Sequence, residues 1–100
     1  MKLLKQPLEF QWDQGNQKKN VTKHGVTNQE CEEIFFDKNR KILKDKPHST
    51  IEDRYIVVGR TKSERLLFAI FTLRGRKIRV ISARDLNKKQ ESHLYYEETS

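Results

Sequence analysis

The sequence predicts a single α+β domain, in which a small, twisted, mainly antiparallel sheet packs with two N-terminal helices and one C-terminal helix. Hydrophobic residues make up 34% of the chain and are gathered in runs such as YIVVG and LLFAIFTL, which indicates a folded core. The apolar period changes from helix-like to strand-like after residue 40. No linker rich in Pro, Gly or Ser divides the 100 residues, so we expect one domain over 1–100, with its core at about 8–96 and short flexible ends.

The N-terminal part is expected to form a strand and then a helix. Residues 8–12, LEFQW, alternate apolar and polar side chains and predict a short strand. Asp13 is a suitable N-cap, and the polar segment after it predicts a surface helix that ends at His24, before Gly25 at a C′ position.

A second helix and four strands are expected next. TNQE at 27–30 has the pattern of a capping box, and Cys31, Ile34 and Phe35 form the apolar stripe of the helix that it begins. Four later segments read as strands joined by short turns, which predicts an antiparallel meander; they are RKILKD (40–45), EDRYIVVGR (52–60), RLLFAIFTL (65–73) and RKIRVISAR (76–84).

The chain is expected to close with a helix after Asp85, capped by Asp85 or Asn87. The third of the four strands is apolar on both faces and therefore belongs inside the sheet. The complete expected order is β-α-α-β-β-β-β-α.

The charge favours an anionic partner. The chain carries 21 Lys and Arg against 14 Asp and Glu, a net charge of +7, which indicates nucleic acid or an acidic protein. Residues 74–89 contain seven basic residues and one acid, a local balance of 7 − 1 = +6. A solvated face that keeps the protein soluble explains such a run equally well.

Several classes of protein are excluded or disfavoured. A single cysteine, Cys31, excludes an intrachain disulfide framework and fits a reducing cytoplasm. The sequence has no apolar run of 18 residues and no signal-peptide pattern, so we expect a cytoplasmic protein without a membrane partner. It has neither metal-ligand spacing nor a dinucleotide or phosphate-loop motif, so no metal and no cofactor are expected.

The segment KIRVISARD places two arginines in one strand. Arg79 and Arg84 are five positions apart and should lie on opposite faces, unless a bulge or the strand end near Ser82 and Ala83 redirects Arg84. Both arginines are candidates for binding phosphate through their planar guanidinium groups. The alternative is that they are rim charges paired with acids such as Asp85.

Other candidates have alternatives of the same kind. Arg54 shares a face with Ile56 and could converge with Arg79, or it could pair with Glu52 or Asp53.

Histidine and tyrosine add candidates for proton transfer and base stacking. His24 suits proton transfer or the capping of a helix C-terminus. His48 lies in a loop, where it is either functional or simply solvated. Tyr95 and Tyr96 are the aromatic residues expected to be exposed for stacking or proton donation.

Seven motifs together resemble the BrnT family of bacterial toxins over about residues 8–96. They are FQWD, NVTKHGVT, EIFFD, KPHS, DRYIVVGRT, RLLFAIFT and IRVISARD. The resemblance implies a RelE-like fold, ribonuclease activity that arrests translation, and a cognate antitoxin of the BrnA type. The matching positions are Trp12, Lys23, His24, His48, Arg54, Arg79, Ser82 and Arg84.

We therefore expect a metal-independent endoribonuclease toxin of a type II toxin-antitoxin system, in which the 2′-hydroxyl of the RNA attacks the adjacent phosphorus. The expected catalytic residues are Lys23, His24, His48, Arg54, Arg79 and Arg84. The expected RNA-binding residues are Arg60, Arg76, Lys77, Ser82 and Tyr95. This mechanism expects the arginines to gather, free of carboxylates, around one pocket for a single phosphodiester.

Two other readings stay open. The basic run fits a non-catalytic module that binds nucleic acid or an antitoxin, and it also fits an interaction domain for an acidic partner. If the chain is a toxin, whether active or degenerate, operator DNA would be bound only through the antitoxin complex, within which the chain could also form homodimers.

Overall fold

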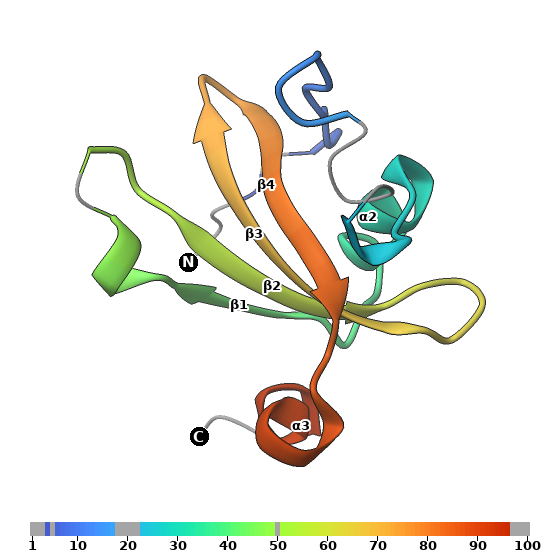
Figure 1. Ribbon diagram of the computed structural model, residues 1–100. Coiled ribbons are helices and arrows are strands. Elements are labelled where there is room, and N and C mark those ends of the chain that lie inside the picture. The colour runs from blue at the N-terminus through green and yellow to red at the C-terminus, as the bar shows by residue number, and fades with distance from the viewer. Residues whose placement is uncertain (1–3, 5, 18–22, 50, 97–100) are drawn as a thin grey trace.

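A computed structural model describes residues 4, 6–17, 23–49 and 51–96, and the elements of this part of the chain are shown in Figure 1. The α-helices are α2 (Asn28–Ile34) and α3 (Lys88–Tyr96). The strands are β1 (Lys41–Lys44), β2 (Tyr55–Arg60), β3 (Leu66–Arg74) and β4 (Lys77–Asp85), and a short 3₁₀ turn covers Lys46–His48.

The four strands form one antiparallel sheet in the order β1-β2-β3-β4, which confirms the predicted meander. Each strand pairs with its sequence neighbour because the connections are short. Gly75, in the turn between β3 and β4, has a φ of 62°, a left-handed conformation that glycine adopts without a steric penalty. As predicted, the apolar β3 lies inside the sheet.

Helix α2 covers one face of the sheet, and the capping box predicted at TNQE is present, with Thr27 and Glu30 bonded reciprocally. The rings of Phe35 and Phe71 meet edge to face, 5.1 Å apart, in the core beneath it. Gly59 lets α2 lie close to β2, because a Cβ at position 59 would lie 2.7 Å from the Ile34 carbonyl oxygen. The core on this face is completed by Val26, Cys31, Ile34, Val57, Leu67, Ala69, Ile78, Val80 and Ala83.

Helix α3 packs against the opposite face, which we call the α3 face and which carries Val58, Leu66 and Phe68 under the helix. Figure 1 shows α3 beyond the end of β4, so that it covers one end of this face. Asn87 caps the helix, as predicted, by accepting hydrogen bonds from the amides of Lys89 and Gln90, each at 3.1 Å.

The N-terminal segment differs from the prediction. Phe10 makes only an isolated parallel bridge to Ile78, so residues 8–12 do not form the expected strand. The side chain of Asn16 explains why pairing stops, because it binds the Gln11 carbonyl at 3.0 Å and the Asp13 amide at 2.8 Å and turns the chain away. The strand was predicted from alternation alone, which does not reveal this turn.

The predicted helix count was also wrong, since the described residues contain two α-helices rather than three. The helix expected from Asp13 to His24 does not begin at Asp13, because residues 14–17 form a turn in which Asn16 and Gln17 both donate to the Asp13 carbonyl. Lys23 and His24 are helical, and the part of the prediction that covers 18–22 lies outside the described residues. Glycine and asparagine favour turns, but the prediction placed Gly15 and Asn16 in a helix.

Candidate functional site

A bulge in β4 brings Arg79 and Arg84 to the same face of the sheet. Thr72 pairs with Arg79 and Phe68 pairs with Arg84, but the register shifts between Ile70 and Phe71, so that one extra residue of β4 is accommodated. Thr72 and Phe68 are four positions apart on β3 and therefore point to the same side. The bulge that a shared face required is thus present, and both arginines belong to the α3 face.

Arg54 continues a row across this face. Its position before Tyr55 places it on the same side as Ile56, and the pairing of Tyr55 with Phe71 carries it toward Thr72. The Thr72 hydroxyl donates to the Asp53 carbonyl at 2.7 Å, which holds the chain beside this row. Neighbouring strands are about 4.8 Å apart, so the Cα atoms of Arg54 and Arg79 flank Thr72 at a separation of roughly 10 Å.

Arg79 is bound by a carboxylate. Its Nη1 lies 2.5 Å from Oδ2 of Asp13 and its Nη2 lies 3.0 Å from Oδ1, and only 14% of the arginine side chain is exposed. The hydrogen bonds from Arg79, and then the one from the Gly15 amide, hold the pKa of Asp13 below its ordinary value. The same hydrogen bond from Arg79 to Asp13 raises the pKa of the arginine, so the pair is fully ionised at neutral pH.

Arg84 is bound in the same way at the other end of the face. Its Nη1 and Nη2 lie 2.8 and 2.7 Å from the two oxygens of Glu91 on α3, and its guanidinium lies 4.2 Å from the centre of the Phe68 ring. The hydrogen bonds from Arg84 lower the pKa of Glu91. A cation over an aromatic ring contributes about 0.5–1 kcal/mol at an exposed site, so ring and carboxylate together fix the guanidinium plane.

The expectation of one shared pocket is therefore wrong. Arg79 and Arg84 share a face, but four residues of β3 separate their rows, a distance of roughly 13 Å. Each is engaged by an acid, as the rim-charge alternative held, although the acids are Asp13 and Glu91 rather than Asp85. Two arginine positions this far apart match two points along a nucleic-acid strand better than one phosphate.

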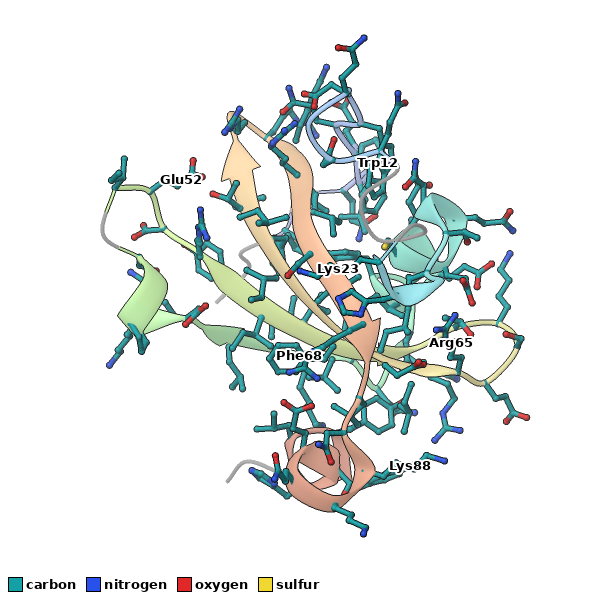
Figure 2. All side chains as sticks on the ribbon, in the orientation of Figure 1. Trp12, Lys23, Glu52, Arg65, Phe68 and Lys88 are labelled. Atoms are coloured by element: carbon teal, nitrogen blue, oxygen red, sulfur yellow. The ribbon has the colours of Figure 1, made fainter. Side chains whose placement is uncertain are left out.

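The segments that carry the histidine candidates lie at different ends of the sheet. Lys23 and His24 are exposed, and Arg65 binds the carbonyl of His24 at 3.3 Å while it binds Asp85 at the end of β4. In the view of Figure 2, Lys23 appears between the labelled Trp12 and Phe68. His48 is in the turn between β1 and β2, at the end of the sheet where Arg54 lies.

The Ser49 hydroxyl anchors the turn that carries His48. It donates to the Asp45 carbonyl at 2.7 Å and accepts from the Arg54 amide at 2.9 Å. Arg54, Arg79 and the 46–48 turn therefore lie at one end of the sheet. At the other end Arg84 is on the α3 face, whereas Arg65 joins the Lys23–His24 segment to Asp85, whose partner Leu67 belongs to the core on the α2 side.

The expected RNA-binding residues are more scattered. Arg76 and Lys77 are exposed in and after the turn between β3 and β4, and Ser82 is half-buried opposite Ile70 on the α3 face. Arg60 donates to the Tyr96 hydroxyl at 2.8 Å and lies over the Tyr95 ring.

The prediction of an exposed Tyr95 was wrong. Its side chain packs in the α3 core with only 7% of the residue exposed, and its hydroxyl donates to Asp37 at 2.6 Å. Tyr96, which is 61% exposed, is the tyrosine available for stacking. Adjacent residues on a helix face different directions, so the sequence alone did not separate the two.

Sequence reasoning missed several residues that shape the site. Asp13, Phe68, Thr72 and Glu91 do so on the α3 face, and Arg65 does so on the α2 side. Asp13 was assigned as a helix cap, and its partner lies 66 positions away. Phe68 and Thr72 could have been found from the predicted β3–β4 hairpin, because they face Arg84 and Arg79 once the bulge is counted. Arg65 and Glu91 carry no local signal.

The described part of the chain provides no group of three or more His, Cys, Asp and Glu residues placed to hold a metal ion. Cys31 is buried, and burial raises the pKa of its thiol to about 12, which leaves it a structural residue rather than a nucleophile. Among the residues that the structure describes, no helix is long and apolar enough to span a membrane.

Comparison with known proteins agrees with the motifs quoted above. The model of one family, described as the ribonuclease toxin BrnT of a type II toxin-antitoxin system, matches residues 12–90. That range contains the whole sheet, α2 and every arginine of the α3 face. No curated protein matches the chain. The family match covers most of the sequence, and the chain belongs to the BrnT family of ribonuclease toxins.

Proposed function

We propose that this chain is a metal-independent endoribonuclease that cleaves RNA on the α3 face and thereby arrests translation. The observation that carries the proposal is the placement of Arg54, Arg79 and Arg84 on one sheet face of a chain that belongs to a ribonuclease toxin family. A single strand that crosses this face would meet guanidinium groups at both ends, and a phosphate accepts two parallel hydrogen bonds from each.

The chemistry needs one proton acceptor and one proton donor. The RNA 2′-hydroxyl loses its proton to a base and attacks the adjacent phosphorus, the bond from phosphorus to the 5′-oxygen breaks, and the departing oxygen takes a proton from an acid. The products are a 2′,3′-cyclic phosphate and a 5′-hydroxyl. Lys23 with His24, or alternatively His48, supplies these transfers, a contribution of about 10²- to 10⁴-fold in rate.

The arginines stabilise the charge that grows on the non-bridging oxygens. One well-placed donor is worth about 3 kcal/mol in the transition state. Arg84 holds the phosphate that reacts, while Arg79 and Arg54 hold another phosphate farther along the strand, as the separation of roughly 13 Å between the two rows requires. Arg60, Arg76, Lys77 and Ser82 extend the basic surface along the strand.

Analysis of the RNA ends tests this mechanism. Purified chain, freed of antitoxin and treated with EDTA, should release fragments with 2′,3′-cyclic phosphate and 5′-hydroxyl ends. Single alanine variants of His24, His48, Arg54, Arg79 and Arg84 then assign the roles. Unchanged cleavage rates in both Arg79→Ala and Arg84→Ala would refute the mechanism, and 3′-hydroxyl ends would show another chemistry.

A non-catalytic binding module is the second candidate. The carboxylate partners of Arg79 and Arg84 favour it, because an arginine held by a carboxylate can contribute to binding an anion but is not free to follow the charge that develops during a reaction. Expression in cells separates the two. A toxin should stop growth in the absence of antitoxin, whereas a binding module should be tolerated and its alanine variants should behave like the parent.

The proposed partners follow from the family. An antitoxin of the BrnA type would neutralise the chain in the cytoplasm, by an acidic or helical segment that covers the RGRKIRVISAR side of the sheet. Operator DNA would be bound through this complex, in which the chain could also pair with a second copy. Mapping of the antitoxin to the α2 side would contradict this arrangement.

A further inference from the structure

Glu52 brings a carboxylate to the end of the α3 face where Arg79 lies. Its Oε2 lies 3.9 Å from Nη2 of Arg74. Arg74 is two residues beyond Thr72 on β3, and side chains two positions apart in a strand point to the same side, so this pair belongs to the α3 face. The pKa of Arg79, which its hydrogen bond to Asp13 raises most, is raised further by the charge of Glu52. Glu52 therefore lies within electrostatic reach of two arginines of this face.

The segment that carries Glu52 is held in place through its neighbour Asp53. The Asp53 carbonyl accepts from the Thr72 hydroxyl at 2.7 Å, and the Asp53 carboxylate lies 3.3 Å from Nζ of Lys44. In the view of Figure 2, Glu52 appears beside the segment that leads into β2. The backbone that presents the Glu52 carboxylate is thus fixed before any ligand binds, which lowers the entropic cost of binding.

Glu52 is held more weakly than the other acids of this face. Asp13 and Glu91 each accept two hydrogen bonds from a guanidinium. The contact of Glu52 with Arg74 is too long for a hydrogen bond, and the two side chains are 36% and 52% exposed. An exposed ion pair of this kind contributes little to stability, so a ligand can replace Arg74 as the partner of Glu52 at small cost.

The position of Glu52 suits an RNA base rather than a phosphate. A carboxylate repels phosphate, and when ionised it only accepts hydrogen bonds. The row formed by Arg54, Thr72 and Arg79 is the expected place of one RNA phosphate. Arg74, the neighbour of Glu52, is two residues beyond Thr72 on β3, which is roughly 7 Å. A base attached next to that phosphate is therefore close enough to meet the carboxylate.

Guanine has the base edge that matches a carboxylate. Its Watson–Crick edge presents two adjacent donors, N1–H and the 2-amino group, which two carboxylate oxygens accept side by side. Adenine, cytosine and uracil each place an acceptor beside a single donor group on this edge, and that acceptor would face the negative charge. In single-stranded RNA the Watson–Crick edge is open to recognition by a protein.

From this arrangement we propose that Glu52 is a specificity-determining residue, which binds a guanine base next to the phosphate held by Arg54 and Arg79. The inference rests on the proposed function, because it takes single-stranded RNA on the α3 face as the substrate. The competing explanation is that Glu52 only balances the charge of Arg74.

Binding of RNA that cannot be cleaved tests the inference apart from catalysis. The probes are fluorescent single strands with every 2′-hydroxyl methylated, which consist of uridine except for one central guanosine, inosine or adenosine. Fluorescence anisotropy gives the Kd of each. The parent should bind the guanosine strand at least about 5-fold more tightly than the adenosine strand, and inosine, which lacks the 2-amino group, should fall between them. Equal affinity of the parent for guanosine and adenosine would overturn the proposal.

Glu52→Gln tests whether this residue makes the choice. It keeps the size of the side chain but replaces one acceptor oxygen with an amide donor, so the ratio of the adenosine Kd to the guanosine Kd should fall to about 1. The lost negative charge should strengthen the binding of every strand by the same factor and leave the ratio unchanged. Retention of the guanosine preference in Glu52→Gln would overturn the role of Glu52.

A matched control and a second variant accompany this substitution. Glu33→Gln makes the same exchange on α2, on the opposite side of the sheet, and should keep the parent ratio. Glu52→Ala should lose the preference as Glu52→Gln does, and thermal unfolding checks that each variant is folded.

Cleavage of unmodified RNA tests the proposed function separately. The cut sites of the parent should lie at one fixed distance from a guanosine, and Glu52→Gln should cut without regard to guanosine. If the parent prefers the guanosine strand but cleaves no RNA, the proposed function fails while the role of Glu52 stands. If the parent cleaves RNA without any preference for guanosine, the role of Glu52 fails while the proposed function stands.

Discussion

Arg79 and Asp13 are 66 positions apart in the sequence and are joined by two hydrogen bonds, of 2.5 and 3.0 Å. The carboxylate occupies the fork through which an arginine binds phosphate. A Cβ on Gly15 would lie 2.8 Å from Nη2 of Arg79, so the turn after Asp13 closes over the pair. RNA that uses Arg79 must therefore displace Asp13, and the strength of this pair sets part of the affinity for RNA.

Substitution of Asp13 by asparagine should strengthen RNA binding. Asp13→Asn removes the competing charge from Arg79, because an amide oxygen binds a guanidinium more weakly than a carboxylate does, and we expect the Kd to fall about 3-fold or more. The measurement is fluorescence anisotropy with a single-stranded RNA whose 2′-hydroxyls are all methylated, so that it cannot be cleaved, at one fixed salt concentration.

Glu33→Gln is the control for net charge. It removes one negative charge from α2, on the opposite side of the sheet, where Glu33 accepts from the Lys62 amide at 3.0 Å. It should change the Kd by less than Asp13→Asn does. Weaker binding by Asp13→Asn would mean that Asp13 orients Arg79 for RNA rather than competing with it.

Local patterns predicted the parts of the fold that local contacts decide. The capping box at Thr27, the Asn87 cap and the four-strand meander each depend on neighbouring residues or short turns, and all were confirmed. The N-terminal segment was not predicted, because the Asn16 side chain binds the Val80 carbonyl 64 positions away and this contact leaves no periodic signal. The alternation in LEFQW indicates that one side of the segment is buried. A segment that makes only a single bridge to Ile78 is also buried on one side, so the alternation did not identify a strand.

The site was predictable only in its residue types. The sequence placed arginines in and beside β4 and indicated that a bulge would be needed for Arg84 to share a face with Arg79, and the register contains that bulge. Their partners Asp13 and Glu91 could not be predicted, because a carboxylate pairs with whichever cation the tertiary fold brings near. Tyr95 was misplaced for the same reason, since its burial depends on how α3 sits on the sheet.

The pair between Arg84 and Glu91 should stabilise the docking of α3. In a double-mutant cycle of Arg84→Ala and Glu91→Gln, we expect a coupling free energy of about 1 kcal/mol. This value is lower than that of a buried charged pair, because the Arg84 side chain is 39% exposed and water screens its charge. Urea unfolding of the four proteins gives this value. A coupling indistinguishable from zero would show that Phe68 and the apolar contacts alone hold the helix.

Gly59 should tolerate no larger side chain. The Cβ of Gly59→Ala would lie 2.7 Å from the carbonyl oxygen of Ile34 and 2.9 Å from its Cβ, so that α2 must move away from β2. Overpacking of this kind costs about 1–3 kcal/mol in the free energy of unfolding.

Gly75→Ala is the matched control for this substitution. A Cβ at Gly75 meets nothing within 4 Å, and the only cost is its φ of 62°. It should therefore destabilise the protein by about 1 kcal/mol, and a larger loss than in Gly59→Ala, measured by urea unfolding, would contradict the packing of α2 described above.

The stability should fall in acid through carboxylates that bind arginine, among them Asp13, Asp85 and Glu91. Hydrogen bonds from Arg79, Arg65 and Arg84 lower the pKa values of Asp13, Asp85 and Glu91 from their ordinary values of 3.8 for Asp and 4.5 for Glu. A depressed pKa in the folded state stabilises the protein above the unfolded value, and this contribution is lost as the pH falls through the folded pKa. Thermal unfolding from pH 7 to pH 2.5 should therefore show a Tm that is steady down to about pH 5 and falls below it. The difference in stability between the parent and Glu91→Gln should shrink over the same range, and a difference that stays constant into acid would show that Glu91 is not stabilised by its charge.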